Sequence, residues 1–272
     1  MDSSTNPAPD NPILNSPYKA PGRHWALTDE GEFSQTVNDG RRRSVYYVPV
    51  TPKGRKKSQQ ELDFSMADAE GRAFQVNALV NGIRDQVERW RRSGSQQHLT
   101  HDTVRLLRHW RGDGMQPPPF FCQLEAIETM IWLKEVAPHT EPGRRWLAEL
   151  GAGNDEANPG LFRLAAKMAT GSGKTTVMAM LIAWHAVNAE RGKRSFSNAF
   201  LAICPGITIR DRLKVLDPND PHNYYETRRM VPDDMLADVR KARVVIVNYH
   251  AFKPRETLKV PKYVREVIQG RE

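Results

Sequence analysis

The chain has 272 residues, of which 39% are hydrophobic, so it is long enough to form two modest domains with a buried core. Its formal net charge of +8 is spread along the chain, which is compatible with a nucleic-acid partner without establishing one. Residues 1–30 lack a signal-peptide pattern, and no apolar run approaches the roughly 18 residues that span a bilayer. These features predict a cytoplasmic protein without a membrane partner.

The two cysteines, Cys122 and Cys204, are far apart in the sequence and lie in apolar surroundings. This pattern predicts buried free thiols in a reducing compartment instead of a disulfide framework. The eight histidines are scattered and have no cysteine near them, so the sequence predicts no metal site built from these two residue types.

Residues 1–65 are predicted to form an irregular N-terminal region, because turn-forming residues and short basic clusters dominate it. One short strand is predicted over residues 44–50. The basic clusters at 41–43 and 53–57 are interpreted as solvated loop charge, with contacts to phosphate groups as the alternative.

Residues 66–115 are predicted to form a helical pair. Apolar residues recur at helical spacing over 76–90, which predicts an amphipathic helix, and a second helix is predicted over 101–111 with Thr100 as its N-cap. The second helix carries a row of arginines, which is either a solvent face or a surface for a nucleic-acid backbone. The row consists of Arg105, Arg108 and Arg111.

Residues 116–272 alternate apolar runs with helical stretches, and this alternation predicts an α/β domain with a parallel sheet. A helix is expected over 123–136, and a proline- and glycine-rich loop over 138–160. Three buried strands are expected to lie side by side in the sheet. They are 161–168, 198–204 and 243–248.

The most specific motif is a glycine-rich segment between a predicted strand and a predicted helix. It reads Thr170, Gly171, Ser172, Gly173, Lys174, Thr175 and Thr176. The glycines let backbone N–H groups approach phosphate oxygens, and the helix N-terminus adds positive potential. Lys174 is predicted to reach the β- and γ-phosphates, and the Thr175 hydroxyl to ligate Mg²⁺. The alternative is an ordinary Gly/Ser turn with an incidental lysine.

Four segments occur in a fixed order: FFCQLEA at 120–126, MATGSGKT at 168–175, CPG at 204–206 and VVIVNYHAF at 244–252. In this order they resemble the first RecA-like motor domain of superfamily 2 helicases, in the branch with type III restriction subunits and type I motor subunits. The resemblance implies a partial RecA-like P-loop NTPase domain over residues 116–272. It implies ATP and Mg²⁺ as ligands, and double-stranded DNA and a modification or specificity subunit as partners.

The same resemblance assigns roles to residues outside the glycine-rich loop. Gln123 would read the adenine edge with its amide, and Phe120 or Phe121 would stack on the base; the alternative for Gln123 is an early helix residue without this role. Other residues would face nucleic acid, namely Gly206, Thr208, Arg210, Asn248, Tyr249 and His250. The alternative for Gly206, Thr208 and Arg210 is a helix cap beside an exposed arginine.

In such motors an apolar strand ends in an Asp-Glu pair that holds Mg²⁺ and activates water, and no such strand follows Thr175. Asp233 and Asp234 follow Pro232 at a predicted helix start and are interpreted as a cap. No catalytic residue is therefore assigned. We expect the chain to be the N-terminal part of a longer motor, truncated before this motif and inactive in hydrolysis on its own.

Three functions are compatible with these observations. The first is the ATP-binding portion of a DNA helicase or translocase of a restriction-modification system, and the second is a P-loop phosphotransferase. The third is a non-catalytic remnant that only binds nucleotide. The motif around Gln123 and the strand end at 248–250 favour the first.

Overall fold

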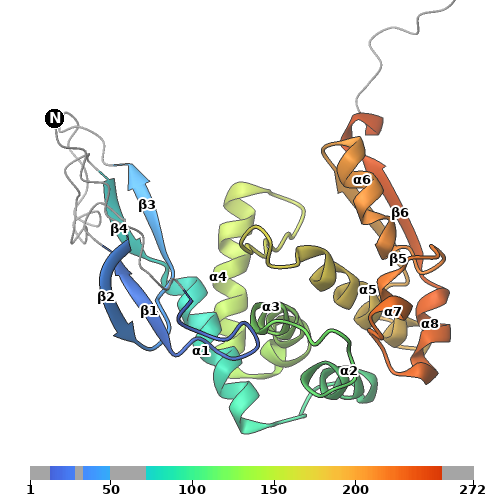
Figure 1. Cartoon of the computed structure of the whole chain (residues 1–272), viewed down its shortest axis with the longest axis horizontal. Coiled ribbons are helices and arrows are strands. Elements are labelled where there is room, and N and C mark those ends of the chain that lie inside the picture. The colour runs from blue at the N-terminus through green and yellow to red at the C-terminus, as the bar shows by residue number, and fades with distance from the viewer. Residues whose placement is uncertain (1–12, 28–32, 50–71, 253–272) are drawn as a thin grey trace, which may run out of the picture.

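The computed structural model describes residues 13–27, 33–49 and 72–252 of the chain. Two antiparallel strand pairs stand beside the first helix at the N-terminal end (Figure 1). The strands are β1 (Arg23–Leu27) paired with β2 (Phe33–Asp39), and β3 (Val45–Pro49) paired with β4 (Arg72–Val76). The strand predicted over 44–50 is thus confirmed, whereas the β1–β2 pair was not expected. The predicted boundary at residue 65 and the basic cluster at 53–57 lie outside the described residues.

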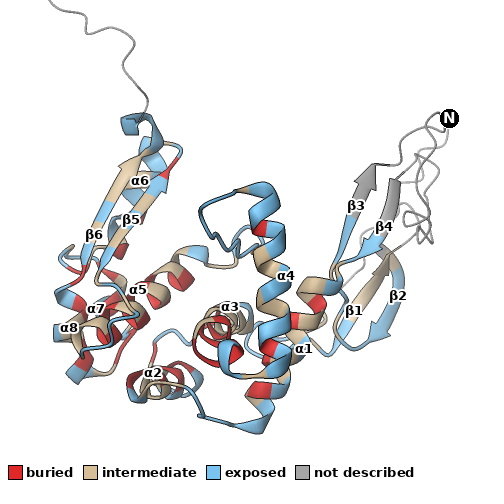
Figure 2. Cartoon of the chain, turned by 180° about the vertical axis from the view of Figure 1, so that it is seen from behind, coloured by how far each residue is buried: buried red, intermediate tan, exposed pale blue. Residues whose placement is uncertain are grey.

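Five long helices form the centre of the molecule. They are α1 (Ala78–Ser93), α2 (His101–Arg111), α3 (Phe121–Ile131), α4 (Glu141–Ala157) and α5 (Lys174–Glu190). A π-helical turn (Trp132–Val136) and a 3₁₀ turn (Ala137–His139) continue α3. Buried residues concentrate on the facing sides of these helices (Figure 2). Val87, Leu106, Ile127 and Ala183 come from four different helices and are all fully buried in one core.

The two helices predicted over 76–90 and 101–111 are present as α1 and α2, and local capping explains where both begin. The Asn77 side chain accepts a hydrogen bond from the Val80 amide at 3.0 Å, and Thr100 accepts one from the Thr103 amide at 3.0 Å. Such caps satisfy amides that have no partner within the helix. The arginine row of α2 is largely engaged within the protein. Arg105 binds Asp234 at 2.7 Å, and Arg111 binds Glu128 at 2.8 Å.

The C-terminal part of the described chain is α/β. It contains β5 (Ala199–Cys204), α6 (Ile207–Leu213), α7 (Tyr224–Thr227), α8 (Leu236–Arg240) and β6 (Arg243–Asn248), with 3₁₀ turns at Lys214–Leu216, Asp233–Met235 and Tyr249–Phe252. β5 and β6 are parallel neighbours, from Ala199 opposite Arg243 to Cys204 opposite Asn248. The prediction of adjacent parallel strands is confirmed for these two. Asp233 and Asp234 begin a short helical turn, also as predicted.

The prediction of a third buried strand at 161–168 is wrong. These residues form no strand, and Leu161, Phe162 and Leu164 are 61%, 54% and 40% exposed. An apolar run becomes a buried strand only where a neighbouring strand satisfies its backbone groups, and the described residues supply none here. Instead, the backbone N–H of Arg163 donates to the Asn154 side chain at 2.8 Å.

The prediction of a loop over 138–160 is also wrong, because this segment forms α4. Thr140 caps the helix, and Pro142 stands in its first turn, where the missing N–H of proline costs nothing. Gly143 is required by packing, since a Cβ there would lie 2.4 Å from the backbone of Ala137. The proline and glycine that suggested a loop therefore serve a helix N-terminus and a close backbone contact.

The prediction of buried thiols is correct for Cys204 and wrong for Cys122, which is exposed on α3; both cysteines are free. In the described part of the chain, no group of three His, Cys, Asp or Glu residues is placed to hold a metal ion. No helix within residues 13–27, 33–49 and 72–252 is both long and apolar enough to cross a membrane.

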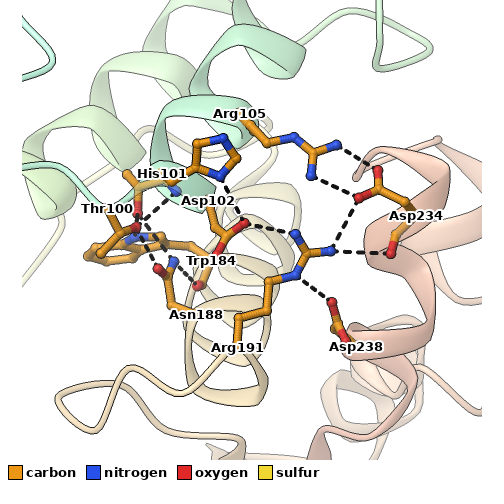
Figure 3. A network of polar contacts seen from close by, with 10 residues as sticks. Thr100, His101, Asp102, Arg105, Trp184, Asn188, Arg191, Asp234 and Asp238 are labelled. Carbon is orange, nitrogen blue, oxygen red and sulfur yellow. Dashed lines mark hydrogen bonds and ion pairs between the residues drawn. The ribbon is translucent and has the colours of Figure 1, made fainter.

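An ionic cluster around Arg191 joins the end of α5 to three other helical segments (Figure 3). Its guanidinium binds Asp102 of α2 at 2.8 Å, Asp238 of α8 at 2.8 Å and Asp234 at 3.2 Å. Arg105 also binds Asp234, so two arginines share three carboxylates. Because three nitrogens of one planar guanidinium each bind a different carboxylate, the cluster fixes the end of α5 against α2 and α8.

His185 on α5 stands between aromatic rings, with the Phe196 ring centroid at 5.2 Å. Burial, together with the nearby positive charge of Lys134, lowers the pKa of His185 to about 4. This pKa lies below the unfolded value of about 6.5, so the resulting stability is fully present above pH 6.5 and is lost as the pH falls towards 4. As the pH falls from 6.5 towards 4, the free energy of unfolding of the wild type should fall by about 2–3 kcal/mol more than that of His185→Phe, because phenylalanine cannot take up a proton.

Thermal unfolding of both proteins at pH 7 and pH 4.5 measures this difference. Equal losses in the two proteins would contradict it. His222→Phe is a suitable control, because that histidine is exposed.

Candidate nucleotide-binding site

The glycine-rich loop leads directly into α5, whose first residue is Lys174. Gly171 and Gly173 have φ angles of 77° and 78°, in the left-handed region that residues with a Cβ avoid. A Cβ on Gly173 would also lie 2.1 Å from the Nε2 atom of Gln123. Backbone conformation and space both require glycine at this position. The resulting turn places backbone amides at the positive end of a 17-residue helix.

Polar side chains of the loop are held by its own backbone. The Lys174 ammonium donates to the Ala169 carbonyl at 2.8 Å, and the Ser172 hydroxyl donates to the same oxygen at 2.7 Å. Lys174 and Gly171 are exposed, and Thr175 is half-buried beside them. Thr170 is exposed as well, at the start of the turn. The loop thus presents a lysine, a hydroxyl and backbone amides, which fit a Mg²⁺-bound triphosphate.

Gln123 lies against the loop, as its predicted role requires. Its Nε2 atom donates to the Ser172 carbonyl at 2.9 Å, and its Oε1 atom accepts from the Phe120 amide at 3.0 Å. The side chain is buried, with 5% exposure. Both ends of the amide are therefore bonded to backbone groups, and Gln123 joins the start of α3 to the loop. Its reading of adenine stays a prediction.

Two aromatic rings were candidates to stack on the base, and their surroundings differ. Arg91 and Arg41 lie over the Phe121 ring, at 5.1 Å and 5.9 Å from its centroid. Phe120 instead packs against Tyr18, with ring centroids 5.5 Å apart. The Phe121 amide also donates to the Pro17 carbonyl at 2.8 Å. The Phe121 ring already carries cations, so Phe120 is the better candidate, and Tyr18 is a neighbour that sequence reasoning missed.

Arg228 is a second residue that sequence reasoning missed. It donates to the Thr176 hydroxyl at 3.1 Å, and its guanidinium lies 4.0 Å from the centroid of the Tyr224 ring. Thr176 is 2% exposed, so this contact reaches the buried side of the first turn of α5. No spacing in the sequence could have found it, since 52 residues separate the two partners.

The residues predicted to face nucleic acid form a separate group at the carboxyl ends of β5 and β6, beside α6 in Figure 1. Gly206 is the N-cap of α6, Thr208 is exposed and Arg210 lies 3.4 Å from Asp211. On the neighbouring strand, the His250 amide donates to the Asn248 side chain at 3.0 Å. The Tyr249 and His250 rings lie 4.0 Å apart. Parallel pairing thus brings the two predicted segments to one edge of the sheet; their role stays a prediction.

Comparison with known proteins identifies a family for most of this region. The family model of the type III restriction enzyme res subunit matches residues 118–266, which is more than half of the chain and includes α3, the loop and both parallel strands. No curated protein and no solved structure matches the chain. The matched region is the helicase-like part of that family. The chain therefore belongs to the family of type III restriction enzyme res subunits.

Proposed function

We propose that the chain binds Mg-ATP at the loop 168–176 and supplies the ATP-binding part of a DNA helicase or translocase of a restriction system. One observation carries the proposal: a turn with two positive-φ glycines begins a long helix with Lys174 as its first residue. Membership in the restriction family supports it. Since no catalytic carboxylate is assigned, the proposal for this chain concerns the binding of nucleotide.

The loop residues fit the proposed ligand chemically. Lys174 would exchange its bond to the Ala169 carbonyl for bonds to the β- and γ-phosphates, and Thr175 would offer its hydroxyl to Mg²⁺. The backbone amides of Gly173, Lys174 and Thr175 would face the phosphate oxygens. Gln123, which contacts the loop, and Phe120, whose amide donates to Gln123, would hold the adenine.

Double-stranded DNA is the proposed macromolecular partner, with a modification or specificity subunit as a protein partner. The edge formed by the ends of β5 and β6 supports DNA contact, because hydroxyl, amide and guanidinium groups gather there. The residues proposed for it are Gly206, Thr208, Arg210, Asn248, Tyr249 and His250.

Calorimetric titration of the chain with Mg-ATP tests the nucleotide site. We expect weak binding, with a Kd on the order of 0.1–1 mM, because motors of this type close their nucleotide site between two domains. Mg-GTP provides the comparison, since the proposed roles of Gln123 and Phe120 predict a preference for adenine. No heat of binding at millimolar Mg-ATP would contradict the proposal.

Replacing Thr175 with valine should remove the Mg²⁺ contribution selectively. The variant keeps the shape of threonine but lacks the hydroxyl ligand, so we expect the affinity gain from Mg²⁺ to shrink by about tenfold. Titrations with ATP in Mg²⁺ and in EDTA measure that gain for both proteins. An unchanged gain would mean that Thr175 does not ligate the metal.

A further inference from the structure

An open cleft of about 600 Å³ is lined by residues of β1, of the segment leading into β3, and of α1. Among the described residues that line it are five arginines and no aspartate or glutamate. The arginines are Arg23, Arg41, Arg42, Arg43 and Arg84. The cleft lies outside residues 118–266, the region matched by the family model, and shares no residue with the nucleotide loop.

Two of these arginines have carboxylate partners behind the cleft wall. Arg41 binds both oxygens of Glu125, one of them at 2.6 Å, and Arg43 binds Asp85 at 2.9 Å. The side chains of the other three form no ion pair with any residue in the described part of the chain. They are Arg23, Arg42 and Arg84. The cleft therefore holds three positive charges that the described residues do not balance.

The surroundings of Arg84 are unfavourable for its positive charge. Its side chain is half-buried, and burial lowers the pKa of its guanidinium. The positive charge of Arg41 lowers that pKa further, and Glu125 only partly offsets both effects. A half-buried cation beside another cation is stabilised by an anion that approaches from solvent.

The backbone that carries Arg41, Arg42 and Arg43 is anchored on both sides. The Asn81 side chain of α1 accepts from the Ser44 amide at 2.8 Å and donates to the Ser44 carbonyl at 3.0 Å. This pair of hydrogen bonds fixes the chain just after the three arginines. Just before them, His24 of β1 bonds to the Gly40 carbonyl at 2.8 Å. A fixed backbone reduces the entropy lost when arginines on it bind a ligand.

We infer that this cleft binds successive phosphate groups of a DNA backbone. Guanidinium groups match phosphate oxygens in a bidentate geometry, and three unpaired ones need a ligand with several charges. Arg23 and Arg42 are exposed at the rim while Arg84 lies deeper, an arrangement that suits an extended strand passing over the cleft. The inference rests on the proposed DNA partner and adds a second contact surface to it, in the N-terminal part of the chain.

Fluorescence anisotropy with a labelled DNA duplex tests the inference. We expect the triple variant Arg23→Gln, Arg42→Gln, Arg84→Gln to bind about 10- to 100-fold more weakly at low salt. The slope of log K against log salt should fall by about 2–3, because each lost phosphate contact removes roughly 0.9. Arg42→Gln alone should reduce the slope by about 1. Arg42 is exposed and unpaired among described residues, so this change leaves the fold intact.

A matched control removes the same three charges elsewhere on the surface. Its changes are Arg144→Gln, Lys193→Gln and Arg194→Gln, at exposed positions. We expect this control to retain most of the affinity and the slope of the wild type. Equal weakening in both triple variants would reduce the effect to net charge and overturn the inference, as would unchanged binding by the cleft variant.

Inorganic pyrophosphate distinguishes a free polyphosphate from DNA. Binding of pyrophosphate that depends on the three arginines, without any binding of DNA, would overturn the DNA assignment. Mg-ATP titrations on the same samples should be identical for wild type and cleft variant, because the loop 168–176 lies elsewhere. A failure of the proposed nucleotide site therefore appears in those titrations alone, separate from the result for the cleft.

Discussion

Mg-ATP affinity is expected to fall by about 10- to 100-fold when Lys174 is replaced by alanine. A hydrogen bond to a charged group contributes roughly 1.5–3 kcal/mol, and each 1.4 kcal/mol corresponds to a tenfold change in affinity. Among the described residues, the Lys174 ammonium has the Ala169 carbonyl of its own loop as its one hydrogen-bond partner, and the side chain is exposed, so its removal leaves no buried charge behind. Calorimetric titration of both proteins measures the loss.

Lys167→Ala is the matched control, because Lys167 is an exposed lysine shortly before the loop. It removes the same charge from the same region but not from the helix N-terminus. We expect its affinity for Mg-ATP to stay within about twofold of the wild type. Similar losses in the two variants would show that the ammonium of Lys174 has no specific phosphate contact.

The second large effect concerns stability. We expect Arg191→Met to lower the free energy of unfolding by about 2–4 kcal/mol, because it leaves Asp102 and Asp238 without their shared cation. This destabilisation is smaller than that from breaking a fully buried ion pair, because Arg191 is 26% exposed and solvent screens its charge. Methionine keeps most of the length of the side chain, so the charge is the main loss. Thermal unfolding at neutral pH measures the change.

Measurements at low pH separate the loss of the Arg191 charge from the loss of its packing contacts. The hydrogen bond from Arg105 is the largest cause that lowers the pKa of Asp234 to about 2, and Arg191 contributes as well. That pKa is below the unfolded value of about 3.9, so the stability from this carboxylate is present above pH 4 and is lost as the pH falls towards 2. The difference between wild type and Arg191→Met should therefore narrow in this window. Arg194→Met, at an exposed position nearby, should be neutral throughout.

The sequence predicted the elements whose signals are local. The apolar periodicity of α1 and α2, the Thr100 cap and the glycine-rich turn before α5 all have short-range causes, and the structure contains each of them. The parallel strands β5 and β6 were also predictable, because their continuous apolar runs lie between helices.

The two errors in the predicted secondary structure have different physical origins. The run at 161–168 has the composition of a strand, yet composition does not show whether a partner strand is present to pair with it. The loop prediction for 138–160 failed because Pro142 and Gly143 were interpreted as breakers. In the structure one stands in a first helical turn and the other meets the backbone of Ala137.

For the site, the sequence singled out the glycine-rich loop and Gln123, and the structure places Gln123 against that loop; their roles in binding nucleotide stay predictions. It could not predict Tyr18 or Arg228, because their contacts with Phe120 and Thr176 depend on packing between distant segments. The arginine-lined cleft also depends on contacts between distant segments, so the sequence could not predict it. Arg41, Arg42 and Arg43 were visible as a basic cluster, but only the fold separates the arginines with carboxylate partners from those without.

The parallel pairing of β5 and β6 has a consequence for the order in which the chain folds. Ala199 lies opposite Arg243, and the chain between these two strands contains α6, α7 and α8. Bringing such distant segments together costs loop-closure entropy before any strand contact forms, whereas each helix forms from neighbours in the sequence. We therefore expect the helices to form before the two strands pair. Because the residues proposed to face DNA lie at the ends of both strands, that edge should take shape only once the strands have paired.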